Sequence, residues 1–255
     1  MNKLINSHRS IRQYHPDPID ENLLNEILNS GLRGSSSGNM QTWSVVVTRD
    51  EQMKKKLYEL HYQQEMILQA PVVLTFCSDV FRMREWIRVN QSKQSFDDFL
   101  GFLTGATDAI ISAQNVALAA ESEGLGICYM GTTWWSADKI SELLELPECV
   151  FPVTSLVIGR PAENPEIRDR LPLESIVHQE KYKKLSDDEI NKIHQQREKL
   201  AWERYQQNPE LFKKMQALGI KKVTDFYSSE IKYSKELHLE KSKMLRELLK
   251  SKKLW

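Results

Sequence analysis

The stretch between residues 105 and 123 constrains the fold of this chain more than any other part of its sequence. Its apolar residues recur at the spacing of a helix with one buried face, and Gly124 follows where glycine commonly ends a helix. The residues of that face are Ala109, Ile110, Ala113, Val116, Ala117 and Ala120. With four alanines on it, the face allows another backbone to pack closely. The helix can therefore lie at the core of a dimer or be buried within one subunit, and the pattern favours neither.

Short segments rich in β-branched and apolar residues predict strands on both sides of this helix. We expect strands within residues 43–48, 72–77, 125–131 and 152–159. Helices are expected at residues 2–7, from the N-cap Asp20 to Gly31, at 50–61 and at 137–145. Residues 79–98 are polar and aromatic, and we expect them to cover the core as helix and loop.

From Ser186 onward the sequence changes character and becomes rich in lysine and glutamate. We expect helices over residues 187–207, 209–218 and 230–250. The main interpretation is that these helices form a solvated cover. The alternative is that some of their cations contact an anionic ligand.

The charge of the chain is balanced, with 35 lysine and arginine residues against 35 aspartate and glutamate residues. A formal net charge of zero provides no overall field to attract nucleic acid or an anionic membrane. We therefore expect neither as a partner. The N-terminus has no apolar segment typical of a secretion signal, and the longest apolar runs are too short to span a bilayer.

Three cysteines, Cys77, Cys128 and Cys149, are widely spaced and have apolar neighbours. This arrangement favours buried thiols over disulfides or a zinc site. The six histidines show no metal-ligand spacing either. We therefore expect a cytoplasmic protein without a metal site.

A short polar run near the N-terminus, His8-Arg9-Ser10-Ile11-Arg12, places two guanidinium groups, an imidazole and a hydroxyl within five residues. Arginine stays charged at any working pH and offers a planar set of donors that matches phosphate or the polar edge of a ring. A second cationic run, Arg168-Asp169-Arg170, lies far downstream. Alone, either run is typical of solvated surface. Together they could close on one anion.

Two further segments have a composition suited to a ligand. Residues 33–39 are small and polar apart from Arg33, which is typical of a flexible loop but also lets backbone and hydroxyl groups approach a ligand closely. Gly131 follows the strand expected within 125–131 and allows the backbone to lie against a flat group. A hairpin or a bulge explains Gly131 equally well.

The sequence lacks the motifs of several large enzyme classes. It has no G-x-x-x-x-G-K-[ST] phosphate loop, no G-x-G-x-x-G after a strand, no H-E-x-x-H, no G-x-S-x-G and no C-x-x-C. We expect an enzyme without an evident nucleophile, metal or acid–base pair to take its reactivity from a cofactor. The features above suit a cofactor with a phosphate tail and a flat polar ring.

The ordered series of motifs resembles the FMN-dependent nitroreductase family, and especially its branch of major oxygen-insensitive nitroreductases and NADPH–flavin reductases. The matching segments are His8 to Arg12 with Tyr14 and Pro18-Ile19, Arg33 to Ser37, Gln64, Ala113 to Asn115, Gly124 to Gly126, Tyr129 to Gly131, Gly159 to Pro165 and Arg168 to Pro172. The resemblance covers residues 5–182 and is vague beyond them.

This resemblance implies an α+β fold with a central, mainly antiparallel sheet flanked by helices, a long central dimer helix and a helical C-terminal excursion. It implies an obligate homodimer that holds two FMN molecules at its interface. Residues 1–255 would form one nitroreductase-like domain, with a core of about 1–182 and a helical extension of about 183–255.

The resemblance also implies a set of cofactor-binding residues. Those expected near the phosphate or the ribityl chain are His8, Ser10, Arg168 and Arg170. Arg9 and Arg12 would lie at the polar edge of the ring, where positive charge stabilises the anion formed on reduction. Those expected along the ring are Gln64, which would hydrogen-bond the pyrimidine, and Tyr129, Met130 and Gly131. Those expected from the partner subunit are Ser36, Ser37 and Gln41.

The activity implied is that of an NAD(P)H oxidoreductase that transfers hydride by a ping-pong sequence to nitroaromatics, quinones, azo compounds or free flavin. No side chain would act as an essential acid, because the flavin carries the chemistry. Lys221 and Lys222 are candidates for selecting NADPH. Two alternatives are a flavin-binding enzyme of the same fold with flavin-modifying or dehalogenase-like chemistry, and a non-catalytic protein whose charged C-terminal helices bind a partner.

Overall fold

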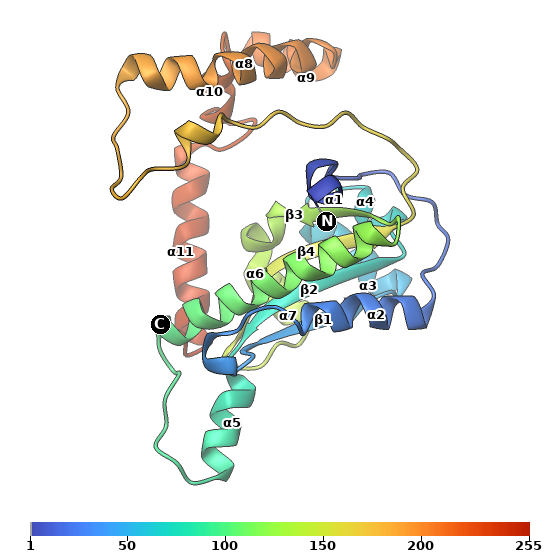
Figure 1. Ribbon diagram of the computed structural model, residues 1–255, viewed down its shortest axis with the longest axis vertical. Helices are drawn as coiled ribbons and strands as arrows, with labels where there is room; N and C mark the ends of the chain where they lie inside the picture. Colours follow the sequence, from blue (N-terminus) through green and yellow to red (C-terminus); the bar gives the residue numbers. More distant parts are fainter. Residues whose placement is uncertain (1) are drawn as a thin grey trace. The chain divides into compact units, whose positions relative to one another are not determined.

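The computed structural model describes residues 2–255, which form two compact units (Figure 1). The first unit consists of residues 2–167 together with 241–255, and the second of residues 168–240. No helix within residues 2–255 is long and apolar enough to cross a membrane. The single domain expected from the resemblance stays a prediction.

Four strands form one sheet in the first unit. They are β1 (Trp43–Thr48), β2 (Val72–Asp79), β3 (Gly126–Met130) and β4 (Val150–Gly159). Their order is β1-β2-β4-β3, and every neighbouring pair is antiparallel. The strand predictions and the expected antiparallel sheet are therefore confirmed.

Strand β4 begins two residues before the expected start and contains Pro152 near its beginning. Proline donates no backbone hydrogen bond and usually interrupts the interior of a sheet. The register between β2 and β4 shifts between Phe76 and Cys77, where Cys77 faces Pro152. This β-bulge lets the strand continue past a residue that by itself predicts a strand boundary.

Helices cover both faces of this sheet (Figure 1). On one face lie α2 (Glu21–Gly31), α6 (Phe99–Ser122) and the end of α11 (Lys235–Ser251). On the other lie α3 (Glu51–Leu60), α4 (Met66–Gln69) and α7 (Ala137–Leu143). Successive side chains of a strand point to opposite faces. The paired Leu74 and Leu156 accordingly pack under α6, and the paired Val73 and Val157 under α3 and α7.

The central helix α6 is longer than the sequence pattern indicates. It begins at Phe99, and the Asp98 side chain caps it by accepting a hydrogen bond from the Gly101 amide (2.8 Å). Glycine weakens an isolated helix, which is why the pattern placed the start at Gly105. A Cβ on Gly105 would lie 2.7 Å from the Thr42 carbonyl oxygen. The glycine is therefore required for α6 to approach the sheet.

The remaining elements of the first unit are α1 (Asn2–Asn6), α5 (Phe81–Val89) and two 3₁₀ turns, η1 (Ser37–Asn39) and η2 (Gly131–Ser136). Asp20 caps α2 by accepting hydrogen bonds from two backbone amides, as predicted. All three cysteines are free and buried, which also agrees with the prediction. The short helix α4 was not predicted.

The second unit contains η3 (Leu173–Ser175), α8 (Asp187–Gln206), α9 (Pro209–Ala217), α10 (Val223–Tyr227) and the first residues of α11. Ser186 and Glu189 cap the start of α8 reciprocally. A small core of Met215, Ile220 and Phe226 holds α8, α9 and α10 together. Helix α10 was not predicted because five residues carry too little periodicity.

Candidate functional site

The N-terminal polar run is held against the sheet at strand β3. Ser10 pairs with Ile127 in a parallel bridge, and the Ile11 amide donates to the Ile127 carbonyl (2.9 Å). Further along, Tyr14 pairs with Pro161 just beyond the end of β4. Two isolated bridges thus fix the run, one beside β3 and one just beyond the end of β4.

Two glycines make room for this segment. Gly126 of β3 and Gly159 of β4 face each other in the sheet. A Cβ on Gly126 would lie 2.7 Å from Ile11 Cγ1, and one on Gly159 would lie 2.8 Å from Tyr14 Cδ1. The buried side chains of Ile11 and Tyr14 therefore occupy the space that larger residues at 126 and 159 would fill. The Tyr14 hydroxyl donates to the Ile11 carbonyl (2.7 Å), and burial raises the pKa of that phenol.

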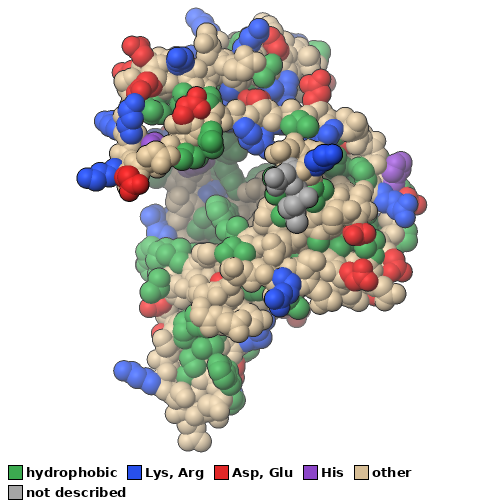
Figure 2. All heavy atoms as spheres, viewed as in Figure 1, with side chains coloured by type: hydrophobic (Ala, Val, Ile, Leu, Met, Phe, Trp, Pro, Cys, Tyr) green, Lys and Arg blue, Asp and Glu red, His purple; other side chains and the backbone are tan. Residues whose placement is uncertain are grey.

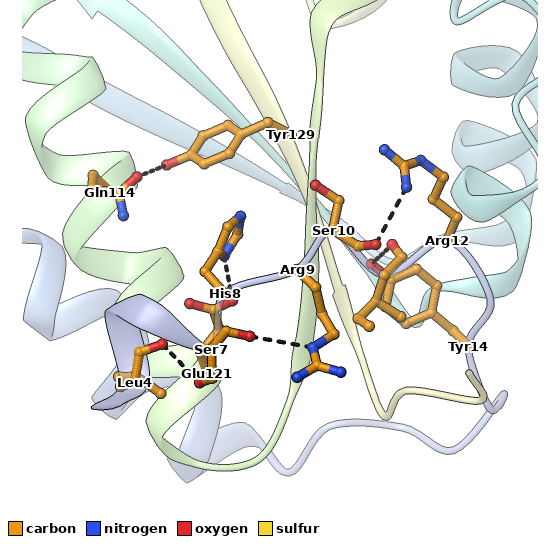
Figure 3. Close-up of polar contacts among 11 residues, drawn as sticks. Leu4, Ser7, His8, Arg9, Ser10, Arg12, Tyr14, Gln114, Glu121 and Tyr129 are labelled. Carbon is orange, nitrogen blue, oxygen red and sulfur yellow. Dashed lines mark hydrogen bonds and ion pairs between the residues drawn. The ribbon is translucent and has the colours of Figure 1, made fainter. Parts of the chain in front are cut away.

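Ile11 is buried, whereas Arg12 is exposed and Arg9 is half-buried; Figure 3 shows the side chains of Arg9 and Arg12. The Arg9 guanidinium donates to Asn164 Oδ1 (2.6 Å) and to the Pro165 carbonyl (3.0 Å). The carboxylate of Glu163 accepts hydrogen bonds from the backbone amides of Arg12 and Gln13. The exposed Arg12 guanidinium makes a long hydrogen bond to the Ser10 carbonyl (3.4 Å). The structure thus brings together the sequence segments 8–12 and 163–165.

Two contacts join this region to α6 (Figure 3). His8 Nδ1 lies 2.6 Å from Glu121 Oε1, and the Tyr129 hydroxyl donates to Gln114 Oε1 (3.4 Å). Burial and the negative charge of Glu121 raise the pKa of Tyr129. These contacts orient His8 and Tyr129 from the helix that crosses the sheet.

The end of β3 combines a buried residue with an open one. Met130 is buried in the core, whereas Gly131 is exposed. A Cβ built on Gly131 has no heavy atom within 4 Å. The backbone at Gly131 therefore faces open space that a flat group could occupy.

Gln64 lies close to this backbone through Thr132. Its side-chain nitrogen donates to the His61 carbonyl (2.9 Å) and to Thr132 Oγ1 (3.0 Å). The ring of His61 is fully buried, and its Nδ1 lies 2.8 Å from the same Thr132 oxygen. Burial lowers the pKa of His61 to about 4, so the ring is neutral at neutral pH.

The loop of residues 36–42 is organised by one buried carboxylate, that of Asp108 on α6. This carboxylate accepts hydrogen bonds from the Ser36 hydroxyl (2.7 Å), the Ser37 amide (3.0 Å), and both the amide (3.0 Å) and hydroxyl (2.9 Å) of Thr42. The Gln41 amide in turn donates to Ser36 Oγ (2.7 Å). The segment is therefore held in place from a helix more than 60 residues away in sequence.

The same loop contains backbone that most residues avoid. Asn39 and Gln41 have φ values of 55° and 53°, in the left-handed region. Arg82 also holds the loop, because its guanidinium donates to the carbonyls of Gln41 and Trp43 (2.8 Å each). Strained backbone of this kind persists only where the surroundings determine it and commonly occurs at ligand sites.

Within one chain, however, this loop does not reach the N-terminal run. Asp108 holds the loop and Glu121 holds His8, and both lie on α6. Thirteen residues of helix separate them, which corresponds to about 20 Å at 1.5 Å per residue. One subunit therefore places Ser36, Ser37 and Gln41 apart from His8.

Four residues predicted from the sequence lie in the second unit, and their contacts are those within that unit. Arg168 and Arg170 are exposed, and the Arg170 guanidinium donates to the carbonyls of Arg168 (3.2 Å) and Asp169 (3.0 Å). Asp169 forms an ion pair with Arg204 of α8 (3.6 Å). Lys221 and Lys222 are exposed before α10. The assignment of all predicted site residues to cofactor binding stays a prediction.

The sequence analysis did not predict several residues that hold the predicted site residues in place. Asp108 had a visible signal, because a carboxylate beside Ala109 on the apolar face of a helix needs partners. Glu121, His61 and Thr132 had none, since their partners are distant in sequence. Residues 2–255 contain no group of three side chains placed to bind a metal.

Comparison with known proteins finds a matching family model, similar sequences and similar solved structures. A model of the nitroreductase family matches residues 5–160. The chain is 40% identical over 195 residues to an NAD(P)H-dependent FMN reductase of Bacillus subtilis, covering 74% of this chain and 78% of the relative. A crystal structure from Bacteroides fragilis aligns over 98% of both chains, with 34% identity and a TM-score of 0.88. The NADPH:FMN oxidoreductase of Vibrio harveyi in complex with NAD⁺ aligns over 99% of this chain and 97% of its own, with 31% identity and a TM-score of 0.76.

Replacing Asp108 by asparagine is expected to loosen the 36–42 loop. Asparagine offers one acceptor oxygen, and its amide group would face donors that the carboxylate now satisfies. We expect a loss of about 1–3 kcal/mol in the free energy of unfolding, measured by urea denaturation. Asp97→Asn, at an exposed position before α6, serves as the control and should unfold like the wild type. Equal stability of Asp108→Asn would contradict the organising role.

The lowered pKa of His61 predicts a dependence of stability on pH. In the unfolded chain the ring has a pKa near 6.5 and takes up a proton, whereas the folded state resists protonation down to about pH 4. The stabilisation from the neutral ring is complete above pH 6.5 and is lost as pH falls from 6.5 to 4. The loss of unfolding free energy amounts to about 3 kcal/mol by pH 4. Urea denaturation between pH 4 and pH 7 should show a steeper loss for the wild type than for His61→Asn, and parallel curves would exclude His61 as the cause.

Proposed function

The chain belongs to the nitroreductase family, and on this basis we propose that it is an FMN-dependent oxidoreductase that uses NAD(P)H. It transfers hydride from the nicotinamide to small electron acceptors such as nitroaromatics, quinones or free flavin in a ping-pong sequence, with bound FMN supplying the redox chemistry. Relatives named as flavin reductases do not favour the flavin-modifying, dehalogenase-like or non-catalytic alternatives.

The observation that carries the proposal is the seating of the cationic run at the start of β3, while the open backbone of Gly131 lies just beyond the end of the same strand. Arg12 is exposed, Gly131 faces open space, and Gln64 lies beside it with an unused carbonyl oxygen. This donor and acceptor set fits a flat heterocycle with an anionic tail. The residues present therefore suit FMN.

The side chains of this region would each contribute a separate interaction. Arg9 and Arg12 would bring positive charge to the polar edge of the ring, which favours the anionic reduced state. Gln64 would bind the pyrimidine, and Tyr129 to Gly131 would support the ring. His8 and Ser10, together with Arg168 and Arg170, are proposed for the ribityl chain and the phosphate.

The exposed face of α6 supports a homodimer. Leu100, Leu103 and Ile110 are 68%, 44% and 49% exposed, and they continue the three- and four-residue spacing through Thr107 and Gln114. Figure 2 shows hydrophobic side chains gathered over α5 and the beginning of α6. A contiguous exposed apolar surface of this kind is typical of a protein interface.

The site also needs two copies to include all of its predicted residues. Ser36, Ser37 and Gln41 are held about 20 Å along α6 from the position of His8. In a twofold dimer that packs α6 against α6, this loop would come from the partner. We therefore propose that FMN binds at the dimer interface.

The three buried free thiols support the proposal that the enzyme works in the cytoplasm.

The redox cycle is tested on the purified protein reconstituted with FMN. Without oxygen, NADPH or NADH should bleach the flavin absorption, and a nitroaromatic or quinone should restore it, because each half-reaction moves one hydride. Stopped-flow rates for the two donors identify the preferred one. A tightly bound flavin that neither donor reduces would contradict the proposed function.

The dimer is tested by placing charge on the exposed face of α6. The double variant Leu103→Glu/Ile110→Glu is expected to sediment as a monomer and to bind FMN at least about tenfold more weakly, because burying two carboxylates in an apolar interface is unfavourable. Leu218→Glu, at an exposed leucine of the second unit, should remain dimeric. A dimeric double variant would show that the interface lies elsewhere.

A further inference from the structure

The buried histidine next to Gln64 has a role that the proposed function does not assign. His61 follows the last turn of α3 and is fully buried, and it contacts Thr132, the residue after Gly131. Thr132 is half-buried and also accepts from Gln64. The three side chains therefore share one hydroxyl oxygen.

The orientation of the Gln64 amide is determined by the His61 carbonyl. A carbonyl oxygen only accepts hydrogen bonds, so the Gln64 atom 2.9 Å from it must be the nitrogen. The second hydrogen of that nitrogen is directed to Thr132 Oγ1, 3.0 Å away. Both hydrogens are thereby used inside the protein, and the Gln64 carbonyl oxygen remains as an acceptor.

The tautomer of His61 follows from its other nitrogen. Nε2 is buried and has no hydrogen-bond partner among the described residues. A hydrogen on Nε2 would be a buried donor without an acceptor, which is costly. The neutral ring therefore carries its hydrogen on Nδ1 and donates it to Thr132 Oγ1, 2.8 Å away.

The direction of the Thr132 hydroxyl hydrogen is consequently fixed. Its oxygen receives one hydrogen from Gln64 and one from His61, which uses both lone pairs. Its own hydrogen must point away from both donors. Thr132 adjoins Gly131, whose backbone faces open space.

We propose that His61 is a positioning residue that makes Thr132 a hydrogen-bond donor beside Gln64 as an acceptor, a pair complementary to the imide edge of the flavin pyrimidine. That edge offers an N–H next to carbonyl oxygens, so Gln64 accepts from the N–H and Thr132 donates to a carbonyl. The inference rests on the proposed function, because it takes FMN as the ligand. His61 acts only through Thr132 and does not touch the cofactor.

The arrangement in the free protein is tested first, without any ligand. Long-range ¹H–¹⁵N correlation spectra of the apoprotein labelled with ¹⁵N-histidine report which ring nitrogen carries the hydrogen, and His61→Asn identifies the His61 signals. We expect hydrogen on Nδ1 at neutral pH. Hydrogen on Nε2 would overturn the proposal whether or not the protein binds FMN.

The consequence for the cofactor is tested by titrating apoprotein with FMN and measuring flavin fluorescence and midpoint potential. Thr132→Val is expected to weaken FMN binding roughly tenfold, the effect of losing one hydrogen bond. Its flavin potential should become more negative, because the lost donor stabilised charge on the reduced ring. Thr132→Ser keeps the hydroxyl and should restore both values. Wild-type affinity and potential in Thr132→Val would overturn the proposal.

The role of His61 is separated from simple packing by a double-mutant cycle. His61→Leu should weaken FMN binding as much as Thr132→Val does, and the double variant should be no weaker than either. His61→Asn, whose amide nitrogen replaces Nδ1, should retain binding. If His61→Leu lowers only thermal stability and keeps wild-type affinity and potential, the proposal is wrong.

If His61→Leu does not fold, the proposal is decided by the FMN affinity of His61→Asn and by the comparison of Thr132→Val with Thr132→Ser. A wild-type apoprotein that does not bind FMN at all would instead refute the proposed function, and the tautomer measurement would still stand.

Discussion

The candidate site depends on the close packing of Ile11 and Tyr14 over Gly126 and Gly159, which face each other in the sheet. Strand glycines are entropically unfavourable, but they allow another segment to lie directly on the backbone. Here that segment is the N-terminal run. Because Ile11 is buried on Gly126, the backbone of the run is fixed beside β3, with Arg9 half-buried and Arg12 exposed.

Helix α6 organises the rest of the site from two distant points on its length. Near its middle, Asp108 holds the 36–42 loop, and near its end Glu121 holds His8. Helix geometry places these two residues about 20 Å apart, so within one subunit the 36–42 loop and His8 do not line the same site. The same helix carries the exposed apolar stripe that includes Leu103 and Ile110. Positioning of the site and the proposed association of subunits thus depend on one element.

Charged and neutral groups have different functions around the proposed ring site. Arg9 and Arg12 are accessible and keep their charge at every working pH. His61, by contrast, is buried and neutral, and it influences its surroundings only through the direction of a hydrogen bond. A charged imidazole at that position would require a partner that the described structure does not provide. In the neutral ring, the lack of a partner for the buried Nε2 directs the single hydrogen to Nδ1 and so to Thr132.

The sequence by itself determined most of the elements and the family. Local periodicity and β-propensity predicted the four strands, the central helix and the cap at Asp20, because these signals depend on neighbouring residues. Ordered motifs from His8 to Pro172 indicated the nitroreductase family, and the family comparison confirmed it. The start of α6 was placed too late because Gly105 weakens a helix locally, and only packing on the sheet compensates.

Tertiary structure alone decided how the candidate residues are held. The pairing of Gly126 with Gly159, the four hydrogen bonds to Asp108 and the contact of His61 with Thr132 all join residues that are far apart in the chain. No local pattern encodes such partners, since their proximity exists only after the sheet and α6 have packed. The sequence therefore indicated which residues to propose for flavin binding, and the folded structure determined which of their atoms already have partners within the chain.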